Sequence, residues 1–418
     1  MLQISCSILN FTKPAGFLQI MGTVDFTNDN AINAIVNRVY TARKDNEIII
    51  TSNVGNGDWI QCKWTTTQRK NTTDFKLCRD EVATSSSGTI QPLVGDTGPK
   101  RDCYFSIQTT SSDQQIQMSC SVVNLTSSVL NIYGAVDYPL KLVLNRIYTS
   151  SSYSNRISLA SEIEYDDWID CKWNITTVEN TTDYKFCRDI VARTANGTIQ
   201  PLTGDPGPLR ECSFSIYAPP DQQIQISCST LNLTSPGSYL RMYGIIDIAN
   251  PPVLNRVYYS SYSPYYLNRI QLQSGINEED WIDCNWTTIP EEITPNSKLC
   301  RHQRATMPNG TITPLEMTLG EPKRECEFNI KANLDQQIQF SCSTLLLSSG
   351  SYLNLYGVIG QSETDSAVIL NRVYYSTRKN DLRLSSKVGS SDTFNCTWTT
   401  ITLLLKTSQF KRIDSFIN

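Results

Sequence analysis

Four copies of one cysteine-anchored pattern run along this chain of 418 residues. The segment Asp-Gln-Gln-Ile-Gln-x-Ser-Cys-Ser is complete at Asp113, Asp221 and Asp335, and a shorter copy opens the chain. A second block, Asp-Trp-Ile-x-Cys-x-Trp, follows in the first three copies, and a looser version begins at Asp392. Because the copies recur about every 110 residues, the size of a domain, they predict tandem domains rather than a short-period solenoid.

The repeats also set the expected domain boundaries. The predicted domains are residues 1–70, 71–179, 180–292 and 293–404, followed by a tail at 405–418. The first copy lacks the opening segment that the others share, and residues 410–414 weakly echo the opening residues 75–79. We therefore expect the chain to be part of a longer array with a signal peptide upstream.

The 14 cysteines fall into four classes by their position in the repeat. Two classes have a member in all four copies, and two have a member in only three. Pairing classes of equal size uses every cysteine, whereas pairing Cys103 with Cys187 would orphan cysteines at both ends of the series. The predicted disulfides are Cys6–Cys62, Cys78–Cys103, Cys120–Cys171, Cys187–Cys212, Cys228–Cys284, Cys300–Cys326 and Cys342–Cys396.

Metal ligation by thiolates is the alternative use of so many cysteines. The chain has no Cys-x-x-Cys pair and a single histidine, so zinc-ribbon spacing is absent and disulfides are favoured. Disulfides persist in oxidising compartments. The cysteines therefore predict a secreted, extracellular protein without a metal or cofactor, although its first residues show no signal-peptide features.

The residues around the cysteines alternate between apolar and polar. Ile116 and Cys120 share one face of such a segment, and this period of two predicts half-buried strands. We expect each core to contain a disulfide with a tryptophan such as Trp173 beside it. Asn-Gly dipeptides at Asn196 and Asn309 predict hairpin turns.

Charge and hydropathy argue against a nucleic-acid partner and against insertion into a membrane. The formal net charge of -4, without a basic stripe, gives no support for a nucleic-acid partner. No apolar run approaches the roughly 18 residues of a membrane helix, so no membrane insertion is expected. Hydrophobic residues make up 39% and charged residues 18%, which is typical of a folded chain and not of disorder.

The order of the motifs resembles that of CUB domains. In the third copy the matching elements are Cys187 and residues 197–201 (Gly-Thr-Ile-Gln-Pro), 212–216 (Cys-Ser-Phe-Ser-Ile), 224–228, 240–244 and 281–286. The resemblance covers nearly the whole chain, as three full copies and one shortened copy. It implies an all-β fold of tandem, jelly-roll-like CUB-like β-sandwiches stapled by disulfides, with Cys187–Cys212 as the family's first disulfide.

Two features depart from the family pattern. The usual second CUB disulfide is missing, and Cys228–Cys284 takes its place. The carboxylates of the calcium-binding subset are missing as well, since Asn124-Leu-Thr and Asn232-Leu-Thr stand in their places. One remaining aspartate per repeat cannot build a site of six to eight oxygens, so no calcium dependence is expected.

Candidate catalytic residues are few. His302 takes the place of Asp80 and Asp189 in the sister copies and has no nucleophile motif near it, so we interpret it as surface variation. An aspartate and an arginine recur in all four copies, which we interpret as a turn residue and a cross-strand ion pair, with a repeated ligand contact as the alternative. They are Asp58, Asp167, Asp280 and Asp392, with Arg38, Arg146, Arg256 and Arg372.

A tyrosine-rich loop is the candidate partner contact. Tyrosine offers a large contact area at low entropic cost, although it is equally at home as a scaffold residue in sheets. The candidates are Tyr258, Tyr259, Tyr262, Tyr265 and Tyr266.

Ten Asn-x-(Ser/Thr) sequons are candidates for glycosylation. Recurrence of one sequon at a fixed repeat position predicts that this position lies on a loop. The candidates are Asn10, Asn71, Asn124, Asn174, Asn180, Asn196, Asn232, Asn285 and Asn309. Asn395 is the least suitable because its sequon contains a paired cysteine.

The resemblance implies a function that the fold alone does not supply. We expect a secreted interaction or adhesion protein that binds an extracellular protein or glycan through repeated CUB-like modules, without catalysis. The alternatives are a non-catalytic regulatory arm of a larger secreted enzyme, such as a protease, and a structural component of the extracellular matrix. An immunoglobulin-like sandwich is the rival fold, but Ile169 stands where that fold needs a tyrosine.

Overall fold

The computed structural model describes residues 1–25, 32–68, 72–93, 100–111, 113–126, 129–136, 142–151, 155–164, 166–177, 181–203, 208–247, 251–262, 268–292, 294–305, 307–360, 366–377 and 380–402. These residues form strands, turns and bends and no helix, which confirms the predicted all-β class. The chain divides into two compact units. One consists of Met1–Ile216, Ser229–Arg241 and Gln271–Asn285, and the other of Tyr217–Cys228, Met242–Ile270 and Trp286–Asn418.

The first repeat forms two three-stranded sheets. In one sheet β1 (Leu2–Asn10) lies between β4 (Val39–Thr41) and β6 (Trp59–Thr66). In the other, β2 (Phe17–Met21) lies between β3 (Ile32–Asn33) and β5 (Ile49–Asn53). Its small core contains the buried side chains of Ile4, Ile20 and Tyr40.

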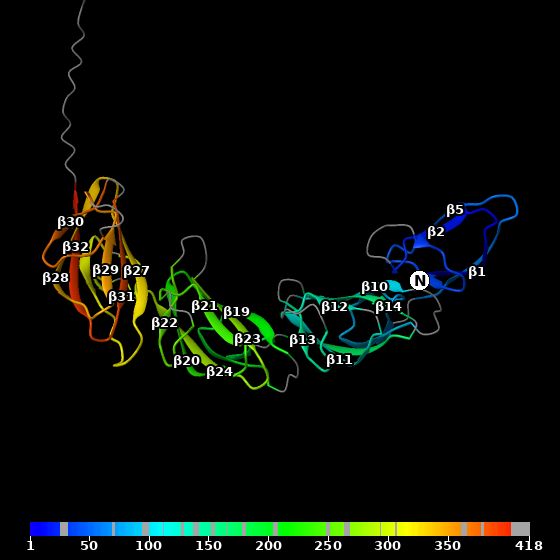
Figure 1. The fold of residues 1–418 in the computed structure, drawn as a ribbon, viewed down its shortest axis with the longest axis horizontal. Coiled ribbons are helices and arrows are strands. Elements are labelled where there is room, and N and C mark those ends of the chain that lie inside the picture. The colour runs from blue at the N-terminus through cyan, green and yellow to red at the C-terminus, as the bar shows by residue number, and fades with distance from the viewer. Residues whose placement is uncertain are drawn as a thin grey trace, which may run out of the picture. The chain divides into compact units, whose positions relative to one another are not determined.

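The second repeat forms a sandwich of two larger sheets. Its strands are β7 (Asp74–Lys76), β8 (Val82–Ala83), β9 (Ser87–Gln91), β10 (Arg101–Gln108), β11 (Gln114–Asn124), β12 (Leu130–Tyr133), β13 (Tyr148–Thr149), β14 (Arg156–Ile163) and β15 (Trp168–Thr177). The sheet orders are β13-β11-β15-β9-β7 and β12-β14-β10-β8, and Figure 1 shows β11 and β13 facing β10, β12 and β14.

The core of the second repeat follows from the alternation of its strands. Along β11 and β15, every second side chain points inward, and Ile116, Cys120, Cys171 and Trp173 are among those that are buried. The ring of Trp173 lies 5.3 Å from that of Phe75, measured between centroids. The predicted core of a disulfide with a tryptophan beside it is therefore present.

The third repeat contributes strands to both units. Its strands are β16 (Asp183–Lys185), β17 (Val191–Ala192), β18 (Asn196–Gln200), β19 (Arg210–Ala218), β20 (Gln222–Asn232), β21 (Tyr239–Tyr243), β22 (Tyr258–Tyr259), β23 (Asn268–Ile276) and β24 (Trp281–Pro290). The sheet orders are β16-β18-β24-β20-β22 and β17-β19-β23-β21.

The fourth repeat is again a two-layered sandwich. Its strands are β25 (Asn296–Lys298), β26 (Asn309–Thr313), β27 (Arg324–Lys331), β28 (Gln336–Leu346), β29 (Tyr352–Tyr356), β30 (Val373–Tyr375), β31 (Asp381–Val388) and β32 (Thr393–Thr402). The sheet orders are β25-β26-β32-β28-β30 and β27-β31-β29, the two layers that Figure 1 shows side by side. Every sheet lies within one repeat, while the domain boundaries themselves stay a prediction.

The predicted Asn-Gly hairpin turns are wrong. Asn196 and Asn309 begin strands β18 and β26, and the chain runs straight on through the glycine. The glycine serves close packing instead, because a Cβ at Gly310 would lie 2.5 Å from the ring of Trp398. Gly88 meets Trp173 in the same way. The residue before the glycine therefore marks the start of the strand that covers the core tryptophan.

The disulfides tie the strands and layers together. Six of them join the pairs expected from the class sizes, namely Cys6–Cys62, Cys78–Cys103, Cys120–Cys171, Cys187–Cys212, Cys300–Cys326 and Cys342–Cys396. Cys228 and Cys284 are also disulfide-bonded, and no described cysteine is free. Cys120 and Cys171 lie directly opposite each other on β11 and β15, whereas Cys78 follows β7 and bonds to β10 of the other sheet.

Candidate functional site

The aspartate that opens each Asp-Trp block closes a turn. Asp58 accepts hydrogen bonds from the backbone N–H groups of Thr12 and Gly55, both at 2.6 Å, and from the Thr12 hydroxyl at 2.6 Å. These hydrogen bonds, that of the hydroxyl above all, lower the pKa of the Asp58 carboxyl. The counterpart bonds join Asp167 to Thr126, Asp280 to Thr234 and Asp392 to Ser348. The predicted turn-forming role is what the structure shows.

The predicted ion pair with the recurring arginine is not formed by Asp58, Asp280 or Asp392. In the described chain, the hydrogen bonds of Asp58, Asp280 and Asp392 all go to turn residues of their own repeat. Arg256 is buried and instead lies 3.1 Å from Asp247 and 2.8 Å from Glu321. In the third repeat, Arg256 and Asp280 therefore have different partners.

A second arginine, placed two residues before a cysteine, completes this contact from the following repeat. Arg324 donates to the carbonyl of Val257 at 2.8 Å and lies 2.7 Å from Glu321. The counterpart contacts in the first unit are those of Arg101 to Asp25 and Val39, of Arg210 to Ile147, and of Arg146 to Pro208. These arginines therefore join consecutive repeats and have a structural role.

The partner-contact prediction is wrong for Tyr258 and Tyr259. They are 1% and 9% exposed, because β22 pairs with β20 and turns both rings into packed interior. The Tyr258 hydroxyl accepts the backbone N–H of Val253 at 2.7 Å, a bond that tyrosines in the other three repeats also make. Tyr265 and Tyr266 lie outside the described residues.

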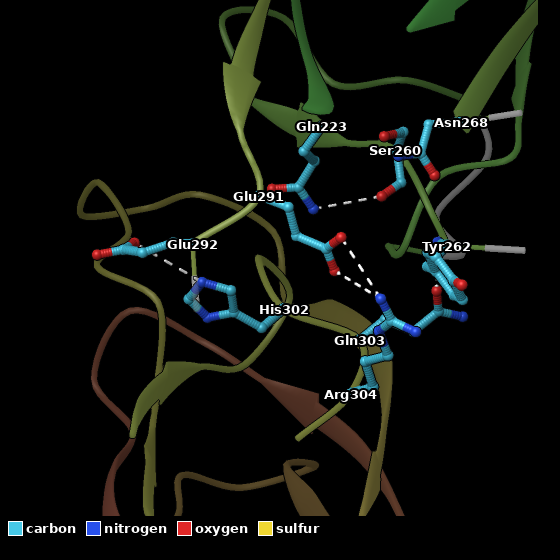
Figure 2. A pocket seen from close by; sticks show the side chains of 9 residues that line it. All are labelled: Gln223, Ser260, Tyr262, Asn268, Glu291, Glu292, His302, Gln303 and Arg304. Carbon is cyan, nitrogen blue, oxygen red and sulfur yellow. Dashed lines mark hydrogen bonds and ion pairs between the residues drawn. The ribbon is translucent and has the colours of Figure 1, made fainter. Parts of the chain in front are cut away.

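Tyr262 lines a small polar pocket of the second unit (Figure 2). The guanidinium of Arg304 lies 3.4 Å from the centroid of the Tyr262 ring and 3.2 Å from a carboxylate oxygen of Glu291. The backbone N–H of Tyr262 donates to Gln303 at 2.6 Å. The pocket has about 20 Å³ of room, enough for a water molecule and too little for a substrate.

His302 lies in the same pocket and is 9% exposed, so its interpretation as surface variation is wrong. Its Nδ1 accepts the backbone N–H of Lys298 at 2.8 Å, and its Nε2 lies 3.9 Å from Glu292. Burial lowers the pKa of the imidazole. Asp80 and Asp189 accept the equivalent N–H in the second and third repeats, which makes His302 a structural substitute for an aspartate.

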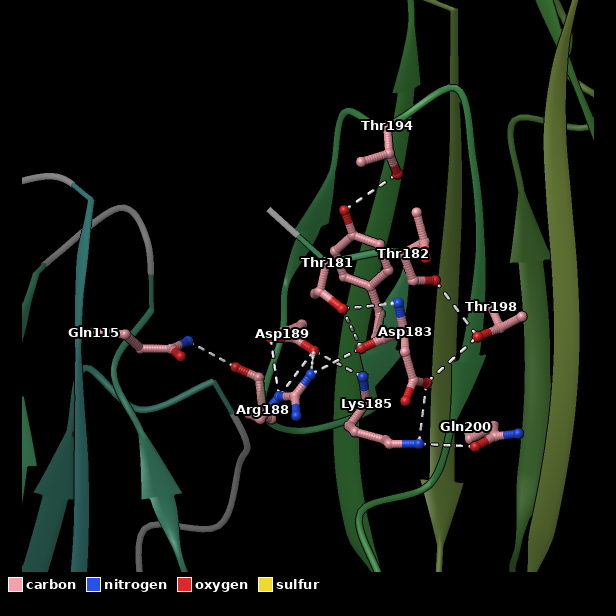
Figure 3. A network of polar contacts seen from close by, with 11 residues as sticks. Gln115, Thr181, Thr182, Asp183, Lys185, Arg188, Asp189, Thr194, Thr198 and Gln200 are labelled. Atoms are coloured by element: carbon pink, nitrogen blue, oxygen red, sulfur yellow. Dashed lines mark hydrogen bonds and ion pairs between the residues drawn. The ribbon is translucent and has the colours of Figure 1, made fainter. Parts of the chain in front are cut away.

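A row of polar side chains lies on the outer face of the larger sheet. In the third repeat, Lys185 Nζ donates to Asp183 at 3.1 Å and to Gln200 at 2.7 Å, as Figure 3 shows. Gln200 in turn donates to Asp283 at 3.2 Å. We call this set, Asp183, Lys185, Gln200 and Asp283, the lysine row.

The second repeat carries the same row. Lys76 Nζ lies 3.2 Å from Asp74 and donates to Gln91 at 2.6 Å, and Gln91 donates to Asp170 at 3.3 Å. In the fourth repeat, asparagine and threonine replace the carboxylates and the amide. Sequence reasoning did not single out this row, although the repeated Asp-(Phe/Tyr)-Lys before a cysteine is the signal that would have found it.

The described sequon asparagines are all exposed. Asn10, Asn124 and Asn232 are the last residues of β1, β11 and β20, so this repeat position lies at a strand end and not within a loop. Asn196 and Asn309 begin strands, and Asn174 and Asn285 lie within them. Asn71 and Asn180 lie outside the described residues.

In the described part of the chain, no three His, Cys, Asp or Glu side chains gather where they could hold a metal ion. No helix there is long and apolar enough to cross a membrane.

Comparisons with known proteins find only distant structural likeness. No family model and no curated protein matches the chain. The chain is similar to the CUB1-EGF-CUB2 domains of rat MASP-1, with 12% identity and a TM-score of 0.19 over 51% of this chain and 100% of that one. It is also similar to the CUB1-EGF-CUB2 domain of human MASP-1/3, with 12% identity and a TM-score of 0.18 over 50% of this chain and 100% of that one. At these scores the likeness supports no assignment to a family, and the resemblance to CUB domains stays a prediction from the sequence.

Proposed function

We propose that this chain is a secreted, non-catalytic interaction protein that binds an extracellular protein or glycan through the outer faces of its larger sheets. The observation that carries the proposal is the lysine row of the third repeat and its counterpart around Lys76. Side chains that neighbours already hold in place on strands lose little conformational entropy when a partner binds. Their recurrence gives the chain at least two equivalent surfaces.

The chemistry of the cysteines and of the pocket supports the same proposal. Disulfide bonding of the described cysteines fits an oxidising compartment and leaves no thiol there to act as a nucleophile. The buried His302 uses its Nδ1 to accept a backbone N–H, and its pocket has no room for a substrate. The CUB-like order of the motifs, read from the sequence, adds that modules of this type recognise other molecules.

The proposal is tested with the full chain produced in a secreting host. Binding to a glycan array and to the surface of intact cells is measured for the natural chain and for a variant with Lys185→Ala and Asp283→Ala. Loss of the lysine row should weaken binding by at least about tenfold, which corresponds to roughly 1.4 kcal/mol.

A matched control lies on the other sheet of the third repeat. Arg241 stacks over Tyr239 at 4.9 Å, and Arg241→Gln should bind like the natural chain. Thermal unfolding checks that each variant is folded. Equal loss of binding in both variants, or no binding by the natural chain to any glycan or cell, would count against the proposal.

A further inference from the structure

In the first and second repeats, two exposed side chains meet at one end of the sheet that carries the cross-strand disulfide. Asn10 is the direct cross-strand partner of Trp59, and Asn124 is the direct partner of Trp168. Directly opposed residues of antiparallel strands point to the same face, with Cβ atoms about 5 Å apart. Each of these asparagines belongs to a sequon, so an attached glycan would begin beside an indole ring.

The tryptophans of these pairs are unusually open to solvent. Trp59 is 63% exposed and Trp168 is 38% exposed, whereas the core tryptophan Trp173 is 2% exposed. Asn124 and Trp168 form no side-chain hydrogen bond to any described residue. In the third repeat, Asn232 ends β20, and Trp281, 37% exposed, begins β24. The observation of interest is the combination: an exposed tryptophan lies directly opposite an exposed sequon asparagine in two repeats, and the same two residue types end and begin the corresponding strands of the third.

The fourth repeat lacks this pair of residues but keeps the turn beside it. Leu346 and Thr393 occupy the two positions and are direct cross-strand partners, so asparagine and tryptophan are lost together. The turn nevertheless persists, because Asp392 still accepts the backbone N–H of Ser348 at 2.5 Å. The aspartate and the Ser or Thr are thus required by the turn in every repeat.

The turn therefore accounts for the last residue of each sequon but not for its asparagine. The Thr12 and Thr126 hydroxyls bond to Asp58 and Asp167 whether or not a glycan is present. Leu346 is 68% exposed, which shows that the strand end itself does not demand a polar residue. The asparagine and the tryptophan occur together in the first three repeats and are absent together from the fourth, which indicates a role that the two residues share.

We infer that Asn10, Asn124 and Asn232 carry N-linked glycans whose first sugar packs its apolar C–H face against Trp59, Trp168 and Trp281. The ring of an N-acetylglucosamine presents several C–H groups on one face, and an indole offers a broad apolar surface with a negative π face to them. The contact covers the exposed tryptophan and orders the base of the glycan. This inference rests on passage through a secretory compartment, as in the proposed function, and not on the identity of any partner.

A double-mutant cycle at Asn124 and Trp168 tests the inference. The full chain is produced in a glycosylating host, and site occupancy is read from glycopeptide masses. Trp168→Thr copies the fourth repeat, and Asn124→Gln removes the glycan. We expect occupied Asn124, a melting temperature that falls on Asn124→Gln, and a much smaller fall when Trp168→Thr is already present. For the variants that keep Asn124, stability is measured on the fraction in which this site is occupied.

Enzymatic trimming sharpens the result. A chain trimmed to a single N-acetylglucosamine at each site should keep the stability of the fully glycosylated chain, because only the first sugar touches the indole. Asn174 supplies the matched control, since its cross-strand partners are Gln117 and Ser87 and not an aromatic residue. Asn174→Gln should leave the effect of Trp168→Thr unchanged.

Two results would overturn the inference. The first is the absence of a glycan on Asn124 in the natural chain, because no sugar would then be present to contact Trp168. The second is a change in melting temperature on loss of the glycan that is equal with tryptophan and with threonine at position 168. Such a result would show that the sugar does not contact the indole. Because neither readout involves partner binding, failure here is distinguishable from failure of the proposed function.

Discussion

At the scale of single residues, equivalent positions in different repeats are occupied by side chains of different chemistry. His302 accepts the backbone N–H of Lys298 through Nδ1, where Asp80 and Asp189 use a carboxylate oxygen. Only a neutral imidazole can accept this bond, since protonation turns both ring nitrogens into donors. One repeat of the chain therefore depends on a histidine that must stay neutral to keep this bond.

This dependence predicts acid sensitivity of the fourth repeat. Burial is the main reason why the pKa of His302 is lowered in the folded state, with Arg301 adding to the effect and Glu292 opposing it. A lowered folded pKa means that stability is fully present above the unfolded value of about 6.5 and is lost as the pH falls from there through the folded pKa. Thermal unfolding as a function of pH should show this loss.

The matched variant restores the residue of the sister repeats. His302→Asp places a carboxylate, ionised in this pH range, at the same N–H, so the loss of stability between neutral pH and the folded pKa should disappear. An unchanged acid response in this variant would show that another group is responsible.

At the scale of strands, the neighbour of the Trp-bearing strand decides whether its tryptophan belongs to the core. β15 lies between β11 and β9, and Gly88 of β9 sits opposite Trp173, which is 2% exposed. β6 ends its sheet, and the equivalent Trp64 is 71% exposed. The same sequence motif therefore gives a core residue in one repeat and a surface residue in another.

This contrast predicts unequal effects of one substitution. Trp173→Ala should destabilise the second repeat by about 3–5 kcal/mol, because a cavity replaces a large buried ring. Trp64→Ala should change stability by no more than about 0.5 kcal/mol, as is usual for an exposed side chain. Hydrogen exchange of the β11 and β15 amides, compared with those of β1 and β6, measures both effects. Similar losses in the two repeats would contradict the role given to β9.

At the scale of the molecule, buried arginines join one repeat to the next. Arg256 is 2% exposed and lies against Asp247 and Glu321, while its fourth-repeat counterpart Arg372 is exposed. Removing one partner of a buried ion pair leaves an uncompensated charge. Equivalent arginines are therefore buried where the third and fourth repeats meet and exposed in the fourth repeat.

Arg256→Met should lower the stability of the second unit by about 3–5 kcal/mol, since Asp247 and Glu321 lose their common partner. Arg372→Met should be nearly neutral, within about 0.5 kcal/mol. Differential scanning calorimetry of the full chain measures both, and a second variant, Arg256→Lys, tests whether charge alone suffices. If Arg256→Met melts like the natural chain, the arginine contact contributes nothing to the joint.

Much of this protein was predictable from local pattern. The alternation around Ile116 and Cys120 predicted strands because side-chain direction along a strand depends only on position in the sequence. The disulfides were predictable because pairing cysteine classes of equal size uses every cysteine. The turn at Asp58 was predictable because an aspartate hydrogen-bonds to backbone groups close to it in the fold.

Tertiary structure alone decided the rest. Whether Tyr258 and His302 are buried depends on which surfaces meet, and one of the two partners of Arg256, Glu321, lies in the next repeat. The glycine of Asn-Gly is needed because the ring of Trp398 approaches it from a strand far along the chain. The sequence by itself determined which strands form and which cysteines bond, since these follow from local alternation and from counting. Burial, ion pairing and the meeting of Asn124 with Trp168 follow from distances between remote segments, which only the folded chain sets.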